Sequence, residues 1–298
     1  MSRTVIQRGG RFTGALILLS LTAVSGCASR RVVDSVLLRN HFGLTQGLPY
    51  GSNVRQRLDV YRPRRVEGPA PVIVFLYGGR WQYGSKDEYR LVVDAITRRG
   101  LVAVVPDYRL YPEVRFPSWV EDAARAVRWV HDSIHRFGGD PARIVVVGIS
   151  AGAHTSALLG LDEHYLRQAG VPADAVRGFV SLAGPVATVW TDADVQALMG
   201  PRKEWSATYP IAQVGGREPP LLLLQGGRDK TVSPANAGRL AAHIKQRGGC
   251  ARAIIYAGLN HVGIVVALAL DRFNIAPVLE DVLRFSRAPA EYACRAPS

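Results

Sequence analysis

Cysteine and methionine are scarce in this sequence, with three and two copies among 298 residues. The cysteines stand at positions 27, 250 and 294, and no cluster of Cys, His or carboxylate residues has the spacing of metal ligands. We therefore expect no metal site and no cofactor.

Long linkers, internal repeats and low-complexity stretches are also missing. With 48% hydrophobic and 20% charged residues, the chain can bury a full-sized core and lacks the composition of a disordered protein. Nothing marks a boundary between two folded units. We expect a single domain over residues 27–298.

Acidic residues are absent from the first 26 positions, which carry Arg3, Arg8 and Arg11 ahead of an apolar run at 15–24. A transmembrane helix needs about 20 apolar residues, so this run is too short to span a bilayer comfortably. A basic start, an apolar centre and the small residues Ser25 and Gly26 are the layout of a secretory signal. Residues 1–26 are predicted to be a signal peptide that is removed.

Cys27 follows that segment directly, and residues 24–27 resemble a bacterial lipobox, whose cysteine carries diacylglycerol after cleavage. The resemblance implies an exported lipoprotein held at the cell envelope through Cys27, on the outer membrane or periplasmic face in a Gram-negative cell. A plain secretory signal with an incidental cysteine is the alternative. Cys250 and Cys294 would then be an even pair in an oxidising compartment, where a disulfide and two free thiols both fit.

Basic residues outnumber acidic ones and give a net charge of +13, yet the pattern lacks the features of a nucleic-acid binder. The only local cluster is Arg62, Arg64 and Arg65, and there is no basic helix or alternation of basic and aromatic residues. We interpret the excess as a solvated surface that favours anionic envelope surfaces, and expect no nucleic-acid partner.

Short β-branched runs alternate with longer helical stretches from about residue 56 onward. Such alternation predicts an α/β fold in which a doubly wound, mainly parallel sheet carries helices on both faces. Residues 185–216 look irregular and could form a lid or cap. Strands are expected at 72–76, 102–105, 143–147, 178–182, 221–224 and 253–256, and helices at 86–99, 118–136 (with Ser118 as its N-cap and a stop at residues 138–139), 236–246 and 278–285.

Ser150 lies in a Gly-x-Ser-x-Gly motif between an expected strand and an expected helix. A nucleophile on such a sharp turn needs neighbours without side chains, and Gly148 and Gly152 meet that need. The helix that follows places its N-terminus beneath the serine, which favours developing negative charge. Ser150 is the predicted nucleophile.

A serine hydroxyl needs a base and an orienting acid, which this fold supplies in the order Ser, Asp or Glu, His. Asp229 follows the expected strand at 221–224, and His261 follows the one at 253–256. Because the carboxyl ends of parallel strands share one edge of a sheet, the three side chains are expected to meet. Taken singly, Asp229 could be a loop carboxylate capping the next helix, and His261 a surface histidine.

An oxyanion hole is expected from main-chain N–H groups on two segments. Ala151 supplies the one after the nucleophile. Gly78 and Gly79 follow the expected strand at 72–76, and their N–H groups can approach an oxyanion unobstructed. Elsewhere in a chain, paired glycines would simply indicate a turn.

Residues 72–154 resemble the α/β-hydrolase carboxylesterases with an HGGxW oxyanion loop, which include feruloyl and acetylxylan esterases, kynurenine-formamidase-like enzymes and prenylcysteine methylesterases. With Asp229 and His261 the similarity spans about two hundred residues. The chain departs from the family at Tyr77, where the pattern usually has a histidine that braces the oxyanion loop. The matching segments are residues 77–81, 84–86, 107–110 with Pro112, 116–117, 138–141 and 150–154.

The resemblance implies a serine carboxylesterase that hydrolyses short-chain or aryl esters through Ser150, Asp229 and His261. An arylformamidase or amidase on the same residues is a second interpretation. A catalytically inactive envelope binding protein is a third, supported only by Tyr77. Natural substrate and oligomeric state are not predicted.

Aromatic residues near these motifs suggest an apolar substrate pocket, although such residues are as often packing. The candidates are Tyr77, Trp81, Tyr83 and Trp190. His154 stands one helical turn past Ser150, and packing or a structural hydrogen bond is its expected role.

Overall fold

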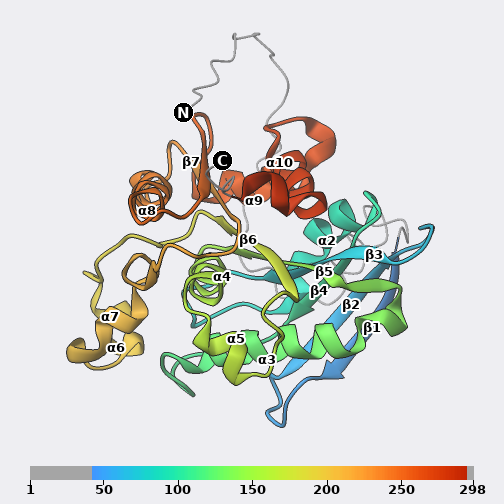
Figure 1. The fold of residues 1–298 in the computed structure, drawn as a ribbon, viewed down its shortest axis with the longest axis horizontal. Helices are drawn as coiled ribbons and strands as arrows, with labels where there is room; N and C mark the ends of the chain where they lie inside the picture. The colour runs from blue at the N-terminus through green and yellow to red at the C-terminus, as the bar shows by residue number, and fades with distance from the viewer. Residues whose placement is uncertain (1–41, 294–298) are drawn as a thin grey trace, which may run out of the picture.

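Eight strands form one sheet in the computed structural model, which describes residues 42–293 (Figure 1). They lie in the order β1-β2-β4-β3-β5-β6-β7-β8. β1 and β2 run antiparallel to their neighbours, and the remaining strands pair in parallel. The strands are β1 (Phe42–Pro49), β2 (Arg57–Pro63), β3 (Ala70–Leu76), β4 (Val102–Pro106), β5 (Gly139–Ile149), β6 (Val176–Leu182), β7 (Leu221–Gly226) and β8 (Ala251–Tyr256).

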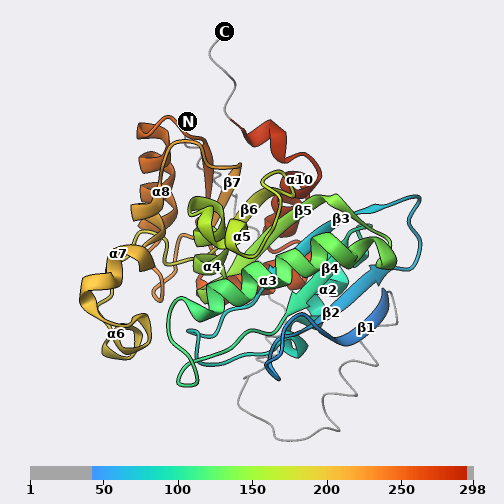
Figure 2. The same cartoon turned by 60° about the horizontal axis from the view of Figure 1, so that its bottom comes forward.

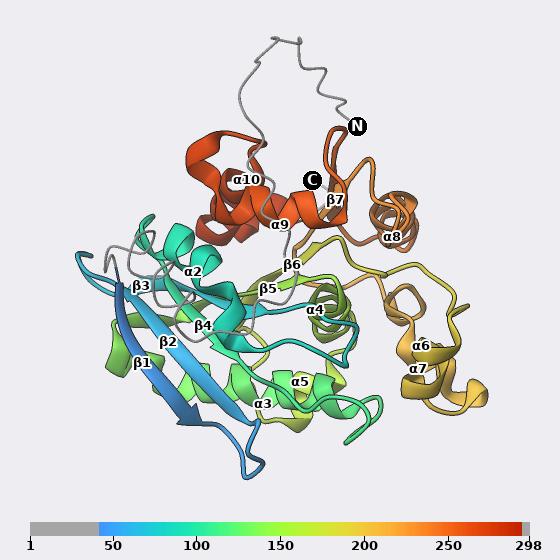
Figure 3. The same ribbon diagram turned by 180° about the vertical axis from the view of Figure 1, so that it is seen from behind.

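Helices cover both faces of this sheet (Figures 1 and 3). α2, α9 and α10 pack on one another and on one face, while α3, α4 and α5 group on the other. α8 packs against β7 and β8 at the end of the sheet. The helices are α2 (Arg90–Thr97), α3 (Ser118–Ser133), α4 (Ala151–Leu161), α5 (His164–Gln168), α6 (Ala193–Met199), α7 (Trp205–Thr208), α8 (Ala235–Gln246), α9 (His261–Ala269) and α10 (Val278–Arg287).

The core lies in the central strands, as their uninterrupted apolar sequences predicted. Every residue of β3 and β4 is buried, because both faces of these strands are covered by helices. Val74 of β3 is in register with Val104 of β4 on one side and Val146 of β5 on the other. The predicted α/β fold with a mainly parallel, doubly wound sheet is confirmed.

The start of α3 differs from the expectation. α3 begins at Ser118 and its N-cap is Pro117, with no side-chain cap bond, so the prediction of Ser118 as the N-cap is wrong. The carbonyl of Pro117 accepts the N–H groups of Val120 and Glu121 at 2.8 and 3.1 Å, and so the turn closes one residue earlier. Gly138 ends the following 3-10 turn with φ +77°, as expected of a stop glycine.

Residues 185–216 are partly helical rather than irregular throughout. They contain α6 and α7 and two 3-10 turns, η3 (Arg202–Glu204) and η4 (Pro210–Gln213). Figure 2 shows α6 and α7 at one end of the molecule, beyond the sheet. We call this segment the cap. Further 3-10 turns are η1 (Lys86–Tyr89), η2 (Ile134–Phe137), η5 (Asp271–Phe273) and η6 (Pro289–Tyr292).

Outside the cap, the elements β1, β2, α5 and α9 were not foreseen. β1 and β2 add an antiparallel edge next to β4, and α9 starts at His261 itself. No helix within residues 42–293 is long and apolar enough to cross a membrane. The predicted signal peptide, Cys27 and Cys294 lie outside the described residues, so the lipid anchor and the bridge to Cys250 stay predictions.

Candidate active site

Ser150 occupies the one-residue turn between β5 and α4. Its backbone has φ +53° and ψ −116°, a conformation that costs an L-residue about 1–3 kcal/mol. The flanking glycines are required by space. A Cβ atom added at Gly148 would lie 2.1 Å from the carbonyl oxygen of Gly152, and one added at Gly152 would lie 2.1 Å from that of Leu76. The strained turn holds the serine at the end of the strand.

Ser150, His261 and Asp229 form one hydrogen-bonded chain. His261 Nε2 is 3.0 Å from Ser150 Oγ, and His261 Nδ1 is 2.8 Å from Asp229 Oδ2. A carboxylate can only accept, so Nδ1 carries the proton and Nε2 is left to accept the serine O–H. The structure thus brings together three residues separated by up to 111 positions.

Asp229 is buried and its two oxygens have different partners. Oδ1 accepts the main-chain N–H groups of Thr231 and Val232 at 2.8 and 2.9 Å, which lie before α8, so Asp229 does not cap that helix. Oδ2 accepts from His261 and from Gln225 Nε2, the latter at 2.9 Å. The local bonds therefore fix the carboxylate and leave Oδ2 directed at the imidazole.

His261 is the first residue of α9. Asn260 caps that helix, with its side-chain oxygen accepting the N–H of Gly263 at 2.7 Å. The cap sets where α9 begins, and thereby the position of the imidazole relative to Ser150. From the sequence, His261 was expected only in a loop after a strand.

The glycine loop after β3 lies against the serine. A Cβ atom added at Gly78 would be 3.1 Å from Ser150 Cβ and 3.2 Å from the carbonyl oxygen of Ile149. The N–H of Gly78 donates to the hydroxyl of Tyr89 at 3.3 Å, which differs from its expected role as a free donor. Among the described residues the N–H groups of Gly79 and Arg80 have no acceptor. Ala151, as the first residue of α4, has none inside its helix.

Tyr77 stands buried behind this loop and braces it. Its hydroxyl donates to Asp107 Oδ1 at 3.0 Å and accepts from Arg55 Nη2 at 3.0 Å. Its ring stacks on Tyr108, with centroids 4.5 Å apart, and the Tyr108 hydroxyl donates to the Tyr77 carbonyl. Burial raises the pKa of the Tyr77 phenol, which keeps it protonated, and burial likewise raises the pKa of Asp107. Tyr77 thus makes local hydrogen bonds that can hold the glycine loop, the role expected of the histidine that is usual at this position.

The aromatic residues proposed for a pocket do not line an open surface together. Tyr77, Trp81 and Trp190 are buried, whereas Tyr83 is 65% exposed. Trp81 contacts Trp190 edge to face at 6.0 Å, which joins the glycine loop to the cap. The packing of Tyr77, Trp81 and Trp190 against other rings removes these three side chains from solvent.

His154 connects α4 to the cap. It is completely buried, and its Nε2 donates to the carbonyl oxygen of Thr208 at 2.7 Å. Trp190 Nε1 also donates to Thr208, at Oγ1. Burial lowers the pKa of the His154 imidazole to about 4, so the ring is neutral near pH 7. The expected structural hydrogen bond of His154 is confirmed.

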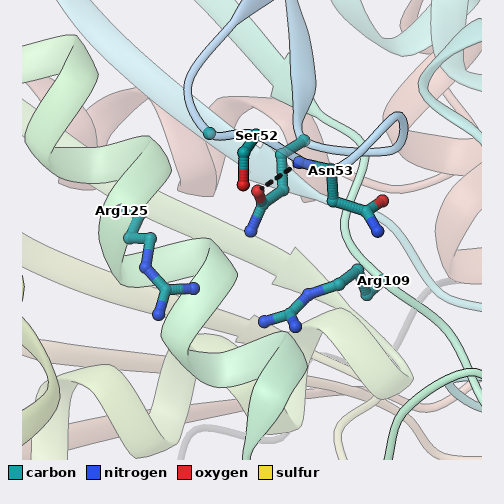
Figure 4. A pocket seen from close by; sticks show the side chains of 6 residues that line it. Ser52, Asn53, Arg109 and Arg125 are labelled. Atoms are coloured by element: carbon teal, nitrogen blue, oxygen red, sulfur yellow. Dashed lines mark hydrogen bonds between the residues drawn. The ribbon is translucent and has the colours of Figure 1, made fainter.

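A hollow of about 600 Å³ lies apart from Ser150, between α3 and the loop joining β1 to β2 (Figure 4). Arg109 and Arg125 point into it, and both bind the buried carboxylate of Asp122, at 2.8 and 2.9 Å. Gln56 donates to the same carboxylate at 2.7 Å. These bonds to Asp122 engage Gln56 and both arginines. The hollow is lined by Gly51, Ser52, Asn53, Gln56, Arg109 and Arg125. No group of three or more potential metal ligands occurs within residues 42–293.

A family model described as BD-FAE matches residues 58–244. The chain belongs to the BD-FAE family. The match runs from β2 into α8 and so includes the glycine loop, Ser150 and Asp229, while His261 lies beyond it.

Curated relatives of this BD-FAE protein carry esterase names. A probable isoprenylcysteine alpha-carbonyl methylesterase of Arabidopsis thaliana is 26% identical over 80% of this chain and 55% of its own length. Esterase LipC of Mycobacterium tuberculosis is 32% identical over 61% of this chain and 50% of its own. The chain spans about half the length of these two relatives.

Solved structures show the same fold. An esterase from the archaeon Pyrobaculum calidifontis matches with a TM-score of 0.68 and 25% identity, over 88% of this chain and 89% of that one. A truncated carbohydrate esterase from gut microbiota matches with a TM-score of 0.71 and 21% identity, over 83% of this chain and 96% of that one. This BD-FAE protein therefore has the α/β-hydrolase fold.

Proposed function

We propose that this BD-FAE protein is a serine carboxylesterase acting on short-chain or aryl carboxylic esters. The observation that carries the proposal is the hydrogen-bonded chain from Ser150 through His261 to Asp229, at the edge of the sheet where the parallel strands end. The esterase names of its relatives support the same reaction class.

In the proposed reaction His261 Nε2 removes the proton from Ser150, and Oγ attacks the ester carbonyl carbon. The oxyanion of the tetrahedral intermediate then re-forms the carbonyl and breaks the bond to the alkoxy group of the ester, which takes the proton from His261 and leaves as the alcohol, so that an acyl-serine remains. Water then attacks the acyl group with the same imidazole as base and releases the acid. Asp229 orients the ring and stabilises its positive charge in both steps.

The oxyanion of each tetrahedral intermediate is assigned to main-chain donors. Ala151 and Gly79 are retained from the sequence prediction. Gly78 is replaced by Arg80, since the N–H of Gly78 already binds Tyr89. Such donors are held in place before the reaction and need no reorganisation when charge develops.

Hydrolysis of p-nitrophenyl acetate by the parent and by Ser150→Ala tests this proposal. We expect the variant to lose several orders of magnitude in kcat, because the three residues act as a unit. Ser156→Ala is the matched control, since Ser156 lies on the same helix and, within residues 42–293, its hydroxyl bonds only to the carbonyl of Val146. A Ser150→Ala variant as active as the control would refute the esterase assignment. A higher kcat/KM for N-formylkynurenine than for aryl acetates would assign the site to arylformamides instead.

We further propose that the chain is exported and anchored to the cell envelope by lipid on Cys27. The support is the basic start, the apolar run and the small residues that precede this cysteine. Incorporation of labelled palmitate into the parent, and its loss in Cys27→Ser, is the expected result. Equal labelling of the parent and of Cys27→Ser would show that Cys27 is not the anchor site.

A further inference from the structure

The hydroxyl of Tyr89 reaches the glycine loop next to the nucleophile. It accepts the N–H of Gly78 at 3.3 Å, and Gly78 lies in contact range of Ser150. In space, the main chain of Gly78 therefore lies between the Tyr89 hydroxyl and Ser150. Neither the glycine motif nor the serine motif predicts this contact, because Tyr89 lies 11 positions after Gly78.

The ring of Tyr89 is held on two sides. Its centroid is 5.3 Å from that of Phe75 and 5.9 Å from that of Tyr77. Tyr77 is itself fixed by Arg55 and Asp107. The hydroxyl thus has a rigid support, which a donor-aligning group needs. Burial raises the pKa of the Tyr89 phenol, so it stays neutral over the ordinary working range of pH.

The main chain turns sharply immediately after Gly78. Gly79 has φ +123°, and a Cβ atom added there would lie 2.2 Å from the carbonyl oxygen of Tyr83. Arg80 and Trp81 follow with φ +55° and +58°. Two successive non-glycine residues with positive φ persist only because contacts around them over-determine the loop. Two hydrogen bonds hold the Tyr77–Gly78 peptide at the start of this turn: its N–H donates to Tyr89, and its carbonyl oxygen accepts from Tyr108.

We propose that Tyr89 is a positioning residue for the oxyanion hole: by binding the N–H of Gly78, its hydroxyl aligns the N–H groups of Gly79 and Arg80 with the carbonyl oxygen at Ser150. The inference rests on the proposed esterase function and adds a side chain to it. Loss of the hydroxyl leaves the Tyr77–Gly78 peptide held only at its carbonyl oxygen, by the Tyr108 hydroxyl, so that its N–H end can shift and misdirect the two donors that follow. Electrostatic stabilisation falls steeply when a donor is misplaced by about 1 Å.

Tyr89→Phe is the decisive variant, because it keeps the ring packing and removes only the hydroxyl. Tyr292→Phe is the control, since the Tyr292 ring packs on Phe285 in a contact between η6 and α10. Both are made in the full chain, and rates are normalised to sites titrated with a fluorophosphonate, so that unfolded protein is not counted.

We expect Tyr89→Phe to lower kcat about 100-fold and to leave KM within about threefold. The inhibition constant of a trifluoromethyl ketone, which forms a tetrahedral adduct with serine, should rise by the factor by which kcat/KM falls. Tyr292→Phe should match the parent in all three. Unchanged kcat and an unchanged inhibition constant in Tyr89→Phe would overturn the proposal. A loss of activity that disappears once rates are normalised to titrated sites would overturn it as well.

Hydrogen exchange of the peptide covering residues 77–84 separates this inference from the proposed function. Faster exchange in Tyr89→Phe, with no change in Tyr292→Phe, is required whether or not the substrate is correct. If the parent neither hydrolyses esters nor reacts with fluorophosphonate while exchange still responds, the esterase assignment fails and the loop-positioning role stands. Identical exchange in all three proteins would contradict the role of Tyr89.

Discussion

At the residue scale, the spacing of Ser150, Asp229 and His261 after three expected strands was enough to anticipate their meeting. Each follows a β-branched or leucine-rich run, and parallel strands end at a common edge. The contact between Gly78 and Tyr89 could not be anticipated in this way. It depends on how η1 folds back over β3, which no local pattern encodes.

Asp229→Asn tests the role of one carboxylate oxygen. Asn keeps an oxygen for the N–H groups of Thr231 and Val232, but its amide can meet His261 only as a donor, which reverses the imidazole tautomer. Because the base nitrogen is then protonated, kcat for an aryl acetate should fall by about 10⁴-fold. A fall of less than tenfold, measured by steady-state kinetics, would show that Asp229 does not orient the base.

At the element scale, central strands were easier to predict than edges and helix starts. β3 and β4 are buried on both faces and read as continuous apolar runs. β1 has no fully buried residue, so its sequence lacks that pattern, and it forms only by pairing with β2. α9 is apolar in sequence and follows β8 after residues 257–260, so the sequence did not show that a helix starts at His261.

The free energy of unfolding should depend on pH through His154, which joins the cap to α4. Its pKa is lowered by burial to about 4, against an ordinary value of about 6.5. Between these values the unfolded chain binds a proton that the folded chain does not, so the free energy of unfolding falls as pH decreases from 6.5 towards 4. The free energy of unfolding is therefore about 3 kcal/mol higher above pH 6.5 than near pH 4.

Urea unfolding of the parent and of His154→Gln at pH 7 and pH 4 measures this effect. Gln can still donate to the Thr208 carbonyl but does not titrate in this range. The parent should lose about 3 kcal/mol more than the variant on acidification. Equal losses would mean that His154 does not contribute to acid sensitivity.

At the scale of the whole molecule, the doubly wound sheet explains why one edge collects the reactive groups. The turn after β5, the loop after β7 and the start of α9 after β8 all meet there, and the glycine loop arrives from β3, next to β5. The sheet order therefore assembles the nucleophile, base, acid and oxyanion donors of the proposed site. Fold class followed from the alternation of strands and helices, whereas the packing of the cap against Trp81 and His154 needed the structure.

The central claim is that this edge activates Ser150 as a nucleophile. Intact-protein mass spectrometry after treatment with a fluorophosphonate measures that directly. One adduct per chain on Ser150 is expected in the parent, with none in Ser150→Ala and full labelling in Ser156→Ala. A parent that stays unlabelled, or a Ser150→Ala variant that is labelled as fully as the parent, would contradict the account.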